Sequence, residues 1–331
     1  MKRYGYNPNP VNKLYRDALH GRLSRREVMK RGTALGLSSA LMGTILRAES
    51  LGAQGTPDDR QRGWSIPSAE ELQEELQLST DYAGVQFNYV GGSEGPNTPF
   101  EQALFERFNE ITGAQATLVQ GAESATDRLQ FYLQTFAAQA GDIDAAQIDV
   151  IWPGILSSHA VDLSDNMPDG DFFERIVENN TVNDILVGIP MFTDAGILYS
   201  RTDLLEEYGF EGPPETWDQL EEMAQTIMEG EITETPEFTG FVWQGNAYEG
   251  LTCDALEWQY SHEGGRIIDP QTLEVELNNE SAITAFERAA GWVGNISPEA
   301  VTGYMEEDAR AVWQGGSAAF MRNWPYAYSL G

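Results

Sequence analysis

Aromatic rings and carboxylates recur where apolar, strand-like segments of this chain end. The candidates are Phe192 and Asp194 after the run 187–190, Trp243 at the end of the run 238–243 with Tyr248 and Glu249 after it, and Trp324 and Tyr326 after the run 318–321. A single aromatic side chain usually packs in a core. Several aromatic rings beside carboxylates fit a sugar site better, because rings stack on the apolar faces of a pyranose and carboxylates accept hydrogen bonds from its hydroxyls.

A further carboxylate interrupts an apolar segment. Asp149 lies in the run 148–152, which is expected to form a strand ended by Pro153, with Trp152 at its carboxyl end. A carboxylate there needs a partner or a ligand to offset its desolvation, so a ligand contact and a structural cap both remain open. For Asp194 a ligand contact is favoured, because ligands of α/β folds gather at the carboxyl ends of strands.

From residue 82 onward, strand-like and helix-like periods alternate. Strands are expected at 85–90, 116–119, 148–152, 187–190, 195–199, 238–243 and 318–321, and helices at 100–111, 127–140, 202–208, 217–227, 251–261, 281–293 and 305–313. Thr202 is predicted to cap one helix, and Thr216 with Gln219 to form a capping box at the next. Residues 267–275 are typical of a hairpin. The order βαβαβ predicts a mostly parallel sheet covered by helices.

The N-terminal segment has the features of an export signal. Arg25 and Arg26 precede an apolar run at 32–46 that is shorter than the about 20 residues of a membrane span. The pattern resembles a twin-arginine signal occupying 1–53; an amphipathic surface helix is the alternative. We therefore expect a linker at 54–81 in the exported chain, a periplasmic or extracellular location, and no membrane insertion after signal removal.

The composition limits the remaining functions. The formal charge is −32, and no lysine follows Lys30, so the exported part should repel nucleic acid and anionic lipid and suits high salt. The single Cys253 excludes an internal disulfide and a cysteine-cluster metal site. His159 and His262, the histidines beyond the signal, lie in no nucleophile-elbow or HExxH context. No cofactor or metal is expected, and the protein is expected to be a monomer.

Two motifs carry a family resemblance. The segment FVWQGNAYEGLTCDALEW at 241–258 and RNWPYA at 322–327, together with the segment at 188–220, are similar to the extracellular solute-binding proteins of ABC sugar importers, in the trehalose/maltose-binding group of family 1. The resemblance runs from about Val85 to the last residue. It implies a two-lobed periplasmic-binding-protein fold of class II type, with mixed sheets flanked by helices, a first lobe at 82–195 and an incomplete second lobe at 196–331. It also implies a sugar held between lobes that close on it, and a membrane permease as partner.

The resemblance assigns sites residue by residue. Asp149 and Arg128 match sugar-contacting positions of the first lobe. Asp194 matches the acidic residue of a PxxxDAGxLYxR pattern, and Phe192 stands where a close relative has tyrosine. Trp324 matches the stacking tryptophan of NWPYA. The predicted ligand-binding set is Asp149, Asp194, Trp324, Arg128, Phe192, Tyr248, Glu249, Trp152, Glu94 and Tyr326.

Two expectations concern extent and function. Members of the family continue for roughly a hundred residues after NWPYA, so the chain is expected to be C-terminally truncated, with an incomplete second lobe. The leading function is non-enzymatic capture of a disaccharide or oligosaccharide. The alternatives are a binder of another sugar or polyol, or an exported glycoside hydrolase that uses Asp149 and Asp194 at a separation of about 5 to 9 Å.

Overall fold

The computed structural model describes residues 30, 67–92, 97–269 and 271–330. The predicted twin-arginine signal and most of the predicted linker lie outside the described residues, apart from Lys30 and 67–81. Glu94 lies outside them as well. No helix in the described ranges combines the length and the apolarity that crossing a membrane requires.

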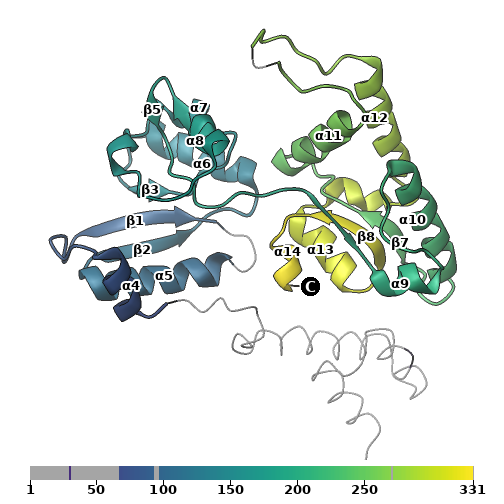
Figure 1. Cartoon of the computed structure of the whole chain (residues 1–331), viewed down its shortest axis with the longest axis horizontal. Helices are drawn as coiled ribbons and strands as arrows, with labels where there is room; N and C mark the ends of the chain where they lie inside the picture. The colour runs from purple at the N-terminus through teal and green to yellow at the C-terminus, as the bar shows by residue number, and fades with distance from the viewer. Residues whose placement is uncertain (1–29, 31–66, 93–96, 270, 331) are drawn as a thin grey trace, which may run out of the picture. The chain divides into compact units, whose positions relative to one another are not determined.

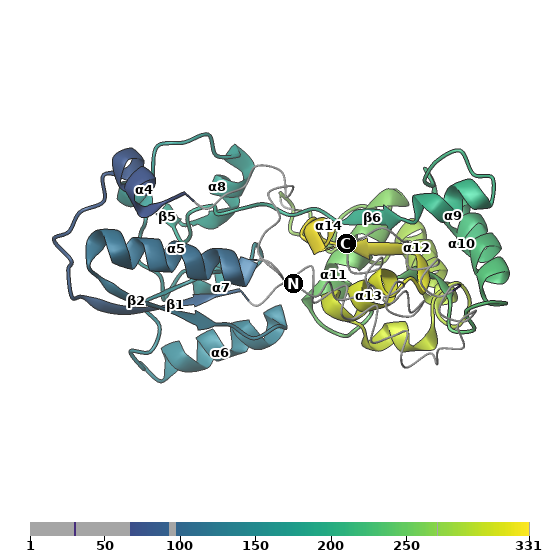
Figure 2. The ribbon, with the colours of Figure 1, turned by 90° about the horizontal axis from the view of Figure 1, so that it is seen from below.

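A three-stranded parallel sheet forms the N-terminal part of the fold. β1 (Gln86–Gly91) lies between β2 (Gln115–Gln120) and β3 (Ala145–Ala146), and Gln86 pairs with Gln115 in register. Helices α5 (Asn97–Thr112) and α6 (Ala125–Ala137) cover opposite faces of this sheet (Figures 1 and 2). The predicted parallel βαβαβ order is therefore confirmed. A short helix, α4 (Ala69–Leu76), precedes the sheet and begins with a complete capping box at Ser68.

The predicted strand at 148–152 is wrong. β3 ends at Ala146, and the chain turns at Asp149, whose Oδ1 accepts from the backbone N–H of Ile151 (3.2 Å) and whose carbonyl accepts from that of Trp152 (3.1 Å). An aspartate that binds the backbone two residues on favours a turn over an extended strand. Pro153 then opens the short helix α7 (Pro153–Leu156), where its missing N–H costs nothing.

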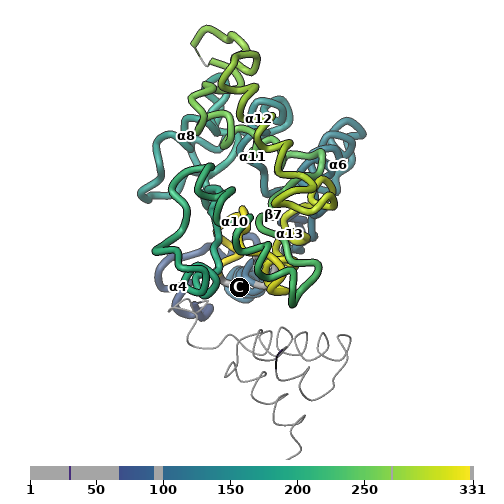
Figure 3. The backbone as a smooth tube through the Cα atoms, turned by 90° about the vertical axis from the view of Figure 1, so that its right-hand side faces the viewer, coloured from purple at the N-terminus to yellow at the C-terminus, as the bar shows by residue number. Residues whose placement is uncertain are grey.

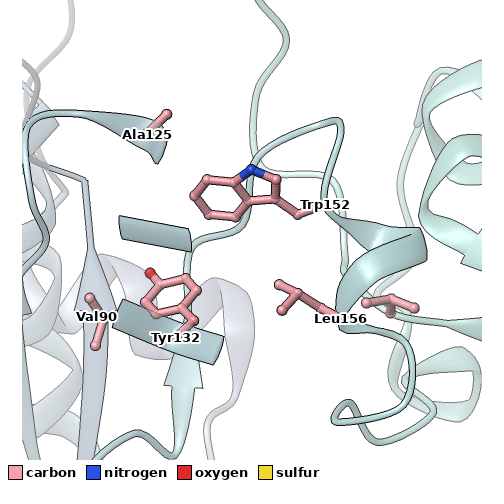
Figure 4. Close-up of a cluster of buried hydrophobic side chains, with 6 residues drawn as sticks. Val90, Ala125, Tyr132, Trp152 and Leu156 are labelled. Atoms are coloured by element: carbon pink, nitrogen blue, oxygen red, sulfur yellow. The ribbon is translucent and has the colours of Figure 1, made fainter. Parts of the chain in front are cut away.

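The core of this part lies beneath α6 and α7. Val90, Tyr132, Trp152 and Leu156 are buried together (Figure 4). The rings of Tyr132 and Trp152 meet edge to face, with centroids 5.7 Å apart, and the Tyr132 hydroxyl donates to the carbonyl of Gln147 (2.9 Å). These contacts attach the loop after β3 to α6.

The predicted strand at 187–190 is also wrong. After the short helices η1 (Ser164–Asn166) and α8 (Glu174–Asn180), a hairpin pairs β4 (Thr181–Val182) with β5 (Ile185–Leu186). Asn183 and Asp184 adopt positive φ, as a two-residue type I′ turn requires, and this turn places the pairing earlier than the apolar pattern indicates. Residues 187–196 have no regular secondary structure.

A second sheet has the order β6-β8-β7. The strands are β6 (Ile197–Ser200), β7 (Thr239–Val242) and a fully buried central β8 (Ala318–Asn323), close to the predicted ranges. Between β6 and β7 lie α9 (Thr202–Glu207) and α10 (Trp217–Glu231). Thr202 was predicted to cap α9, but this prediction is wrong: Arg201 occupies the N-cap position and Thr202 is the first residue of the helix. At α10, Thr216 Oγ1 accepts from Gln219 N–H (3.2 Å) as predicted.

The capping box at α10 is only half formed. The Gln219 side chain accepts from the N–H of Glu215 (2.7 Å) instead of the N–H of the cap residue itself. Leu220, Ala224 and Ile227 are buried at the predicted helical spacing, so the predicted amphipathic face of α10 is confirmed.

The remaining helices follow β7 in the chain. They are α11 (Glu249–Ser261), α12 (Glu280–Trp292), η2 (Glu299–Gly303), α13 (Glu306–Gln314) and α14 (Ala327–Leu330). α11 and α12 lie side by side (Figure 3), and an antiparallel bridge joins Ile268 to Val275 in the predicted hairpin region. Trp243, Trp258 and Trp292 pack edge to face with centroids 5.0 to 6.5 Å apart. Trp243, expected beside a ligand loop, is a core residue.

The backbone contacts group the chain into two compact units. One contains Ser200–Phe241 and Ala311–Phe320, and the other contains Ser65–Tyr199, Val242–Arg310 and Met321–Gly331. All predicted site residues that the structure describes belong to the second of these units. The lobe boundaries predicted from the sequence stay predictions.

Candidate functional site

Aromatic rings and carboxylates meet where β8 ends and α13 begins. We call this group the aromatic–carboxylate cluster; its members are Tyr248, Glu249, Glu306, Trp324 and Tyr326. The indole Nε1 of Trp324 donates to Glu306 Oε1 (3.1 Å). The side-chain amide of Asn323 donates to the backbone carbonyl of Glu306 (3.0 Å), which ties the first turn of α13 to the end of β8.

Two tyrosines complete the cluster. The hydroxyl of Tyr326 donates to Glu307 Oε1 (2.7 Å), and Arg310 binds the other oxygen of Glu307. Burial, and then Glu306, raise the pKa of Tyr248, so its hydroxyl stays protonated at neutral pH. Burial and Glu307 do the same for the pKa of Tyr326. Both phenols are therefore neutral hydrogen-bonding groups.

Glu249 begins α11, directly after Tyr248. Burial raises the pKa of the Glu249 carboxyl, and the thiol of Cys253, which donates to Glu249 Oε1 (2.7 Å), acts in the opposite direction. Gly250 leaves room for the neighbouring ring, because a Cβ at this position would collide with the Tyr248 hydroxyl oxygen. The start of α11 therefore positions a ring and a half-buried carboxyl together.

A second group of predicted residues lies at the carboxyl side of the first sheet. Arg128, on α6, is 4% exposed, donates from Nη1 to the carbonyl of Ala122 (3.1 Å), and lies over the ring of Trp152 with Cζ 5.4 Å from the centroid. Burial raises the pKa of Asp149, while Arg128 favours its charged form. Asp149 thus forms the structural turn described above and also lies within the field of a buried arginine.

Trp152 lies in the core, at 1% exposure (Figure 4), and its ring faces the Arg128 guanidinium. Phe192 and Asp194 lie in the irregular segment before β6, and both are exposed. Burial raises the pKa of the Tyr199 hydroxyl, and the negative charge of Asp194 raises it further. The structure therefore brings Tyr248, Glu249, Trp324 and Tyr326 together. Arg128, Asp149 and Trp152 meet at the first sheet, and Phe192 and Asp194 lie on the segment before β6.

Sequence reasoning missed three members of this arrangement: Glu306, Glu307 and Arg322. Arg322 precedes the NWPYA motif and is almost fully buried. The consecutive acids at the start of the helix expected at 305–313 were a usable signal, because acids favour helix N-termini. Their contact with Trp324 depends on how α13 packs on β8, and no local pattern encodes that packing.

The chemistry of the cluster is that of recognition through hydrogen bonds and ring faces. It offers carboxylate acceptors, phenol hydroxyls and a partly exposed indole, which together suit a neutral polyhydroxylated ligand. Within the described ranges, no group of three or more His, Cys, Asp or Glu side chains is arranged to hold a metal ion.

Comparisons with known proteins agree on one family. The sequence profile of the bacterial extracellular solute-binding proteins matches residues 91–330. A probable ABC transporter-binding protein of Deinococcus radiodurans is 50% identical over 223 residues, which are 66% of this chain and 53% of that protein. This chain therefore spans about half the length of that curated relative.

Solved structures show the same fold. The MalE3 protein of T. maritima, solved with maltose bound, is 38% identical with a TM-score of 0.68, and the match covers 74% of this chain and 62% of that chain. A solute-binding protein of Thermotoga lettingae, solved with α-D-tagatose, is 18% identical with a TM-score of 0.64, covering 74% of this chain and 63% of that one. The predicted α/β, two-lobed periplasmic-binding-protein fold is confirmed.

Proposed function

Because the chain belongs to the bacterial extracellular solute-binding protein family, we propose that it captures a sugar outside the cytoplasm and delivers it to the membrane permease of an ABC importer. The observation that carries the proposal is the aromatic–carboxylate cluster. Its indole, two neutral phenols and carboxylates match the apolar faces and the hydroxyls of a sugar. The protein acts as a binder and not as an enzyme.

We propose a disaccharide of the maltose or trehalose type as ligand. The support is the 38% identity to a protein solved with maltose and the RNWPYA and FVWQGNAYEG motifs. Solved structures below 25% identity, which hold tagatose, ribitol or mannitol, support the fold only. Another sugar or a polyol is the alternative within the same class.

Each predicted residue has a proposed part in binding. Trp324 stacks on a sugar ring, while Tyr248, Glu249 and Tyr326 exchange hydrogen bonds with hydroxyls. Arg128 and Asp149 contribute from the first lobe, and Phe192 and Asp194 from the connecting segment. Trp152 holds Arg128 in place from the core, and Glu94 contributes a hydrogen bond to the sugar.

Closure of the two lobes is the proposed mechanism. The open form samples a closed state, and a ligand that contacts both lobes stabilises that state. The protein is exported by the twin-arginine route to a periplasmic or extracellular location, works as a monomer, and carries an acidic surface suited to high salt.

A thermal unfolding screen in molar salt tests this proposal. A sugar at about 100 times its Kd should stabilise the protein by about 2.7 kcal/mol, which raises Tm by roughly 4–5 °C in a chain of this length. We expect this shift with maltose or trehalose and a smaller one with mannitol. A shift with mannitol alone would move the ligand class to polyols.

Glucose assays of the same mixtures address the competing hydrolase. A binding protein returns its disaccharide intact, so no glucose should accumulate over many equivalents of sugar. Catalytic release of glucose from maltose or trehalose would contradict the proposed function and favour paired-carboxylate chemistry.

A further inference from the structure

The guanidinium of Arg322 lies against one face of the Trp324 indole. The Cζ atom of Arg322 is 3.8 Å from the centroid of the ring. The two residues are two positions apart at the end of β8, so their side chains leave the extended chain on the same side. Arg322 is 5% exposed, whereas Trp324 is partly exposed, so the arginine forms the inner layer of a stacked pair.

The guanidinium itself is held along its edges. Its Nε donates to Glu257 Oε2 (3.1 Å), its Nη2 binds Glu257 Oε1, and its Nη1 donates to Gln244 Oε1 (3.0 Å). Asp254 Oδ1 lies 2.8 Å from Nε, and the Gln244 side chain also donates to the Arg322 carbonyl (3.0 Å). Burial alone would lower the pKa of Arg322, but Glu257 and Asp254 outweigh it and keep the group charged.

The indole is fixed at its other atoms too. Its Nε1 donates to Glu306, as described above. The backbone of Trp324 is held as well: its N–H donates to Asn323 Oδ1 (2.8 Å), and its carbonyl accepts from the Tyr199 hydroxyl (2.8 Å). One face, one edge and the backbone of Trp324 are therefore held before any ligand arrives.

We infer that Arg322 is a positioning residue: held flat by Glu257, Asp254 and Gln244, it fixes the Trp324 indole so that the ring presents its opposite face to the ligand. The inference rests on the proposed function for the nature of that ligand. Planarity is essential, because a guanidinium can stack on a ring while it donates along its edges, and an ammonium cannot do both. A ring ordered in advance costs less to immobilise on binding.

Two variants test the inference. Arg322→Lys keeps the charge and removes the flat surface. Glu257→Gln changes a partly exposed side chain and weakens the ion pair that holds the guanidinium. This variant serves as the test if Arg322→Lys does not fold. The ¹H–¹⁵N indole resonance of Trp324, assigned by its loss in Trp324→Phe, should shift and broaden in both variants of the sugar-free protein.

The affinity for maltose or trehalose should fall about 2- to 12-fold in the same variants, the loss expected when one large side chain must be ordered on binding. In a Trp324→Ala background, Arg322→Lys should bring no further loss, because the two residues act as one unit. Arg201→Lys, which changes an arginine bound to Asp203, is the control and should leave both the resonance and the affinity unchanged.

Two results would overturn the inference: an unchanged Trp324 resonance in both variants, or an equal loss of affinity from Arg322→Lys with and without the Trp324 indole. If the parent protein binds neither sugar, the proposed function fails. The resonance arm still decides whether Arg322 positions the ring.

Discussion

At the scale of single residues, Trp324 is the side chain whose surroundings best support the proposed binding role. Its indole is partly exposed, yet its nitrogen is bound by Glu306 and one face is covered by Arg322. A ring that is ordered before the ligand arrives loses less conformational entropy on binding, so these contacts favour a binding role for Trp324.

Replacement of this ring should weaken binding strongly. We predict that Trp324→Ala costs about 1–3 kcal/mol of sugar affinity, roughly 5- to 150-fold, by analogy with other aromatic stacking platforms. Titration calorimetry measures the loss. Trp217→Ala, at the start of α10 in the other compact unit, is the control and should bind sugar as the parent does. Unchanged affinity in Trp324→Ala would remove this ring from the site.

The sequence predicted members of the candidate site only where the pattern lies within a few neighbouring positions. Trp324 and Tyr248 were found because aromatic residues follow apolar runs, a pattern visible in a few positions. Arg322 and Glu306 were missed because their contacts come from strands and helices distant in the sequence. Trp243 looked equivalent to Trp324, but the packing of α11 against α12 encloses it in the core.

At the scale of elements, the start of α11 provides a matched pair of glycine tests. A Cβ at Gly250 would collide with the Tyr248 ring, whereas a Cβ at Gly291 in α12 meets nothing within 4 Å. We predict that Gly250→Ala displaces Tyr248 and lowers sugar affinity several-fold. Gly291→Ala should stabilise the protein by about 0.4–1 kcal/mol without altering affinity. Calorimetric titration and thermal unfolding report the two effects, and equal affinities would separate Tyr248 from the site.

The first turn of α9 provides a test by pH. Arg201 donates to both carboxylate oxygens of Asp203 (2.8 and 2.6 Å) and lowers its pKa below the ordinary 3.8. The stabilisation is therefore complete above that ordinary pKa and is lost as the pH falls through the lowered, folded-state value. Asp203→Asn should reduce Tm at pH 7, and the difference should shrink below pH 4.

Removal of any negative charge relieves repulsion in so acidic a chain, so a control is needed. Asp165→Asn changes an exposed aspartate and gives the effect of charge alone. Tm differences for Asp203→Asn that match this control at every pH would show that the Arg201 contact contributes nothing.

Element positions followed from the sequence more reliably than element ends. The periodic helices α6, α10 and α12 were placed within about two residues at most ends, because an amphipathic face is repeated over several turns. The strands expected at 148–152 and 187–190 failed. In both places short-range turn chemistry, the Asp149 side chain and the Asn183–Asp184 turn, outweighs the apolar composition.

At the scale of the whole molecule, charge is the dominant feature. A formal charge of −32 implies strong self-repulsion at low salt, and screening shortens from a Debye length of about 10 Å at 0.1 M to about 3 Å at 1 M. We predict that Tm rises as NaCl increases from 0.1 to 2 M. Sucrose at matched osmolality should raise Tm less, and an equal rise would attribute the effect to preferential exclusion instead of screening.

Titration calorimetry of the whole chain with maltose and with trehalose, in molar NaCl, tests the central claim most directly. The account predicts saturable binding of one sugar per chain, with a Kd in the micromolar range that rises about 5- to 150-fold in Trp324→Ala. Folded protein that gives no saturable heat with either sugar up to millimolar concentration would contradict the claim that this chain captures a disaccharide of this type.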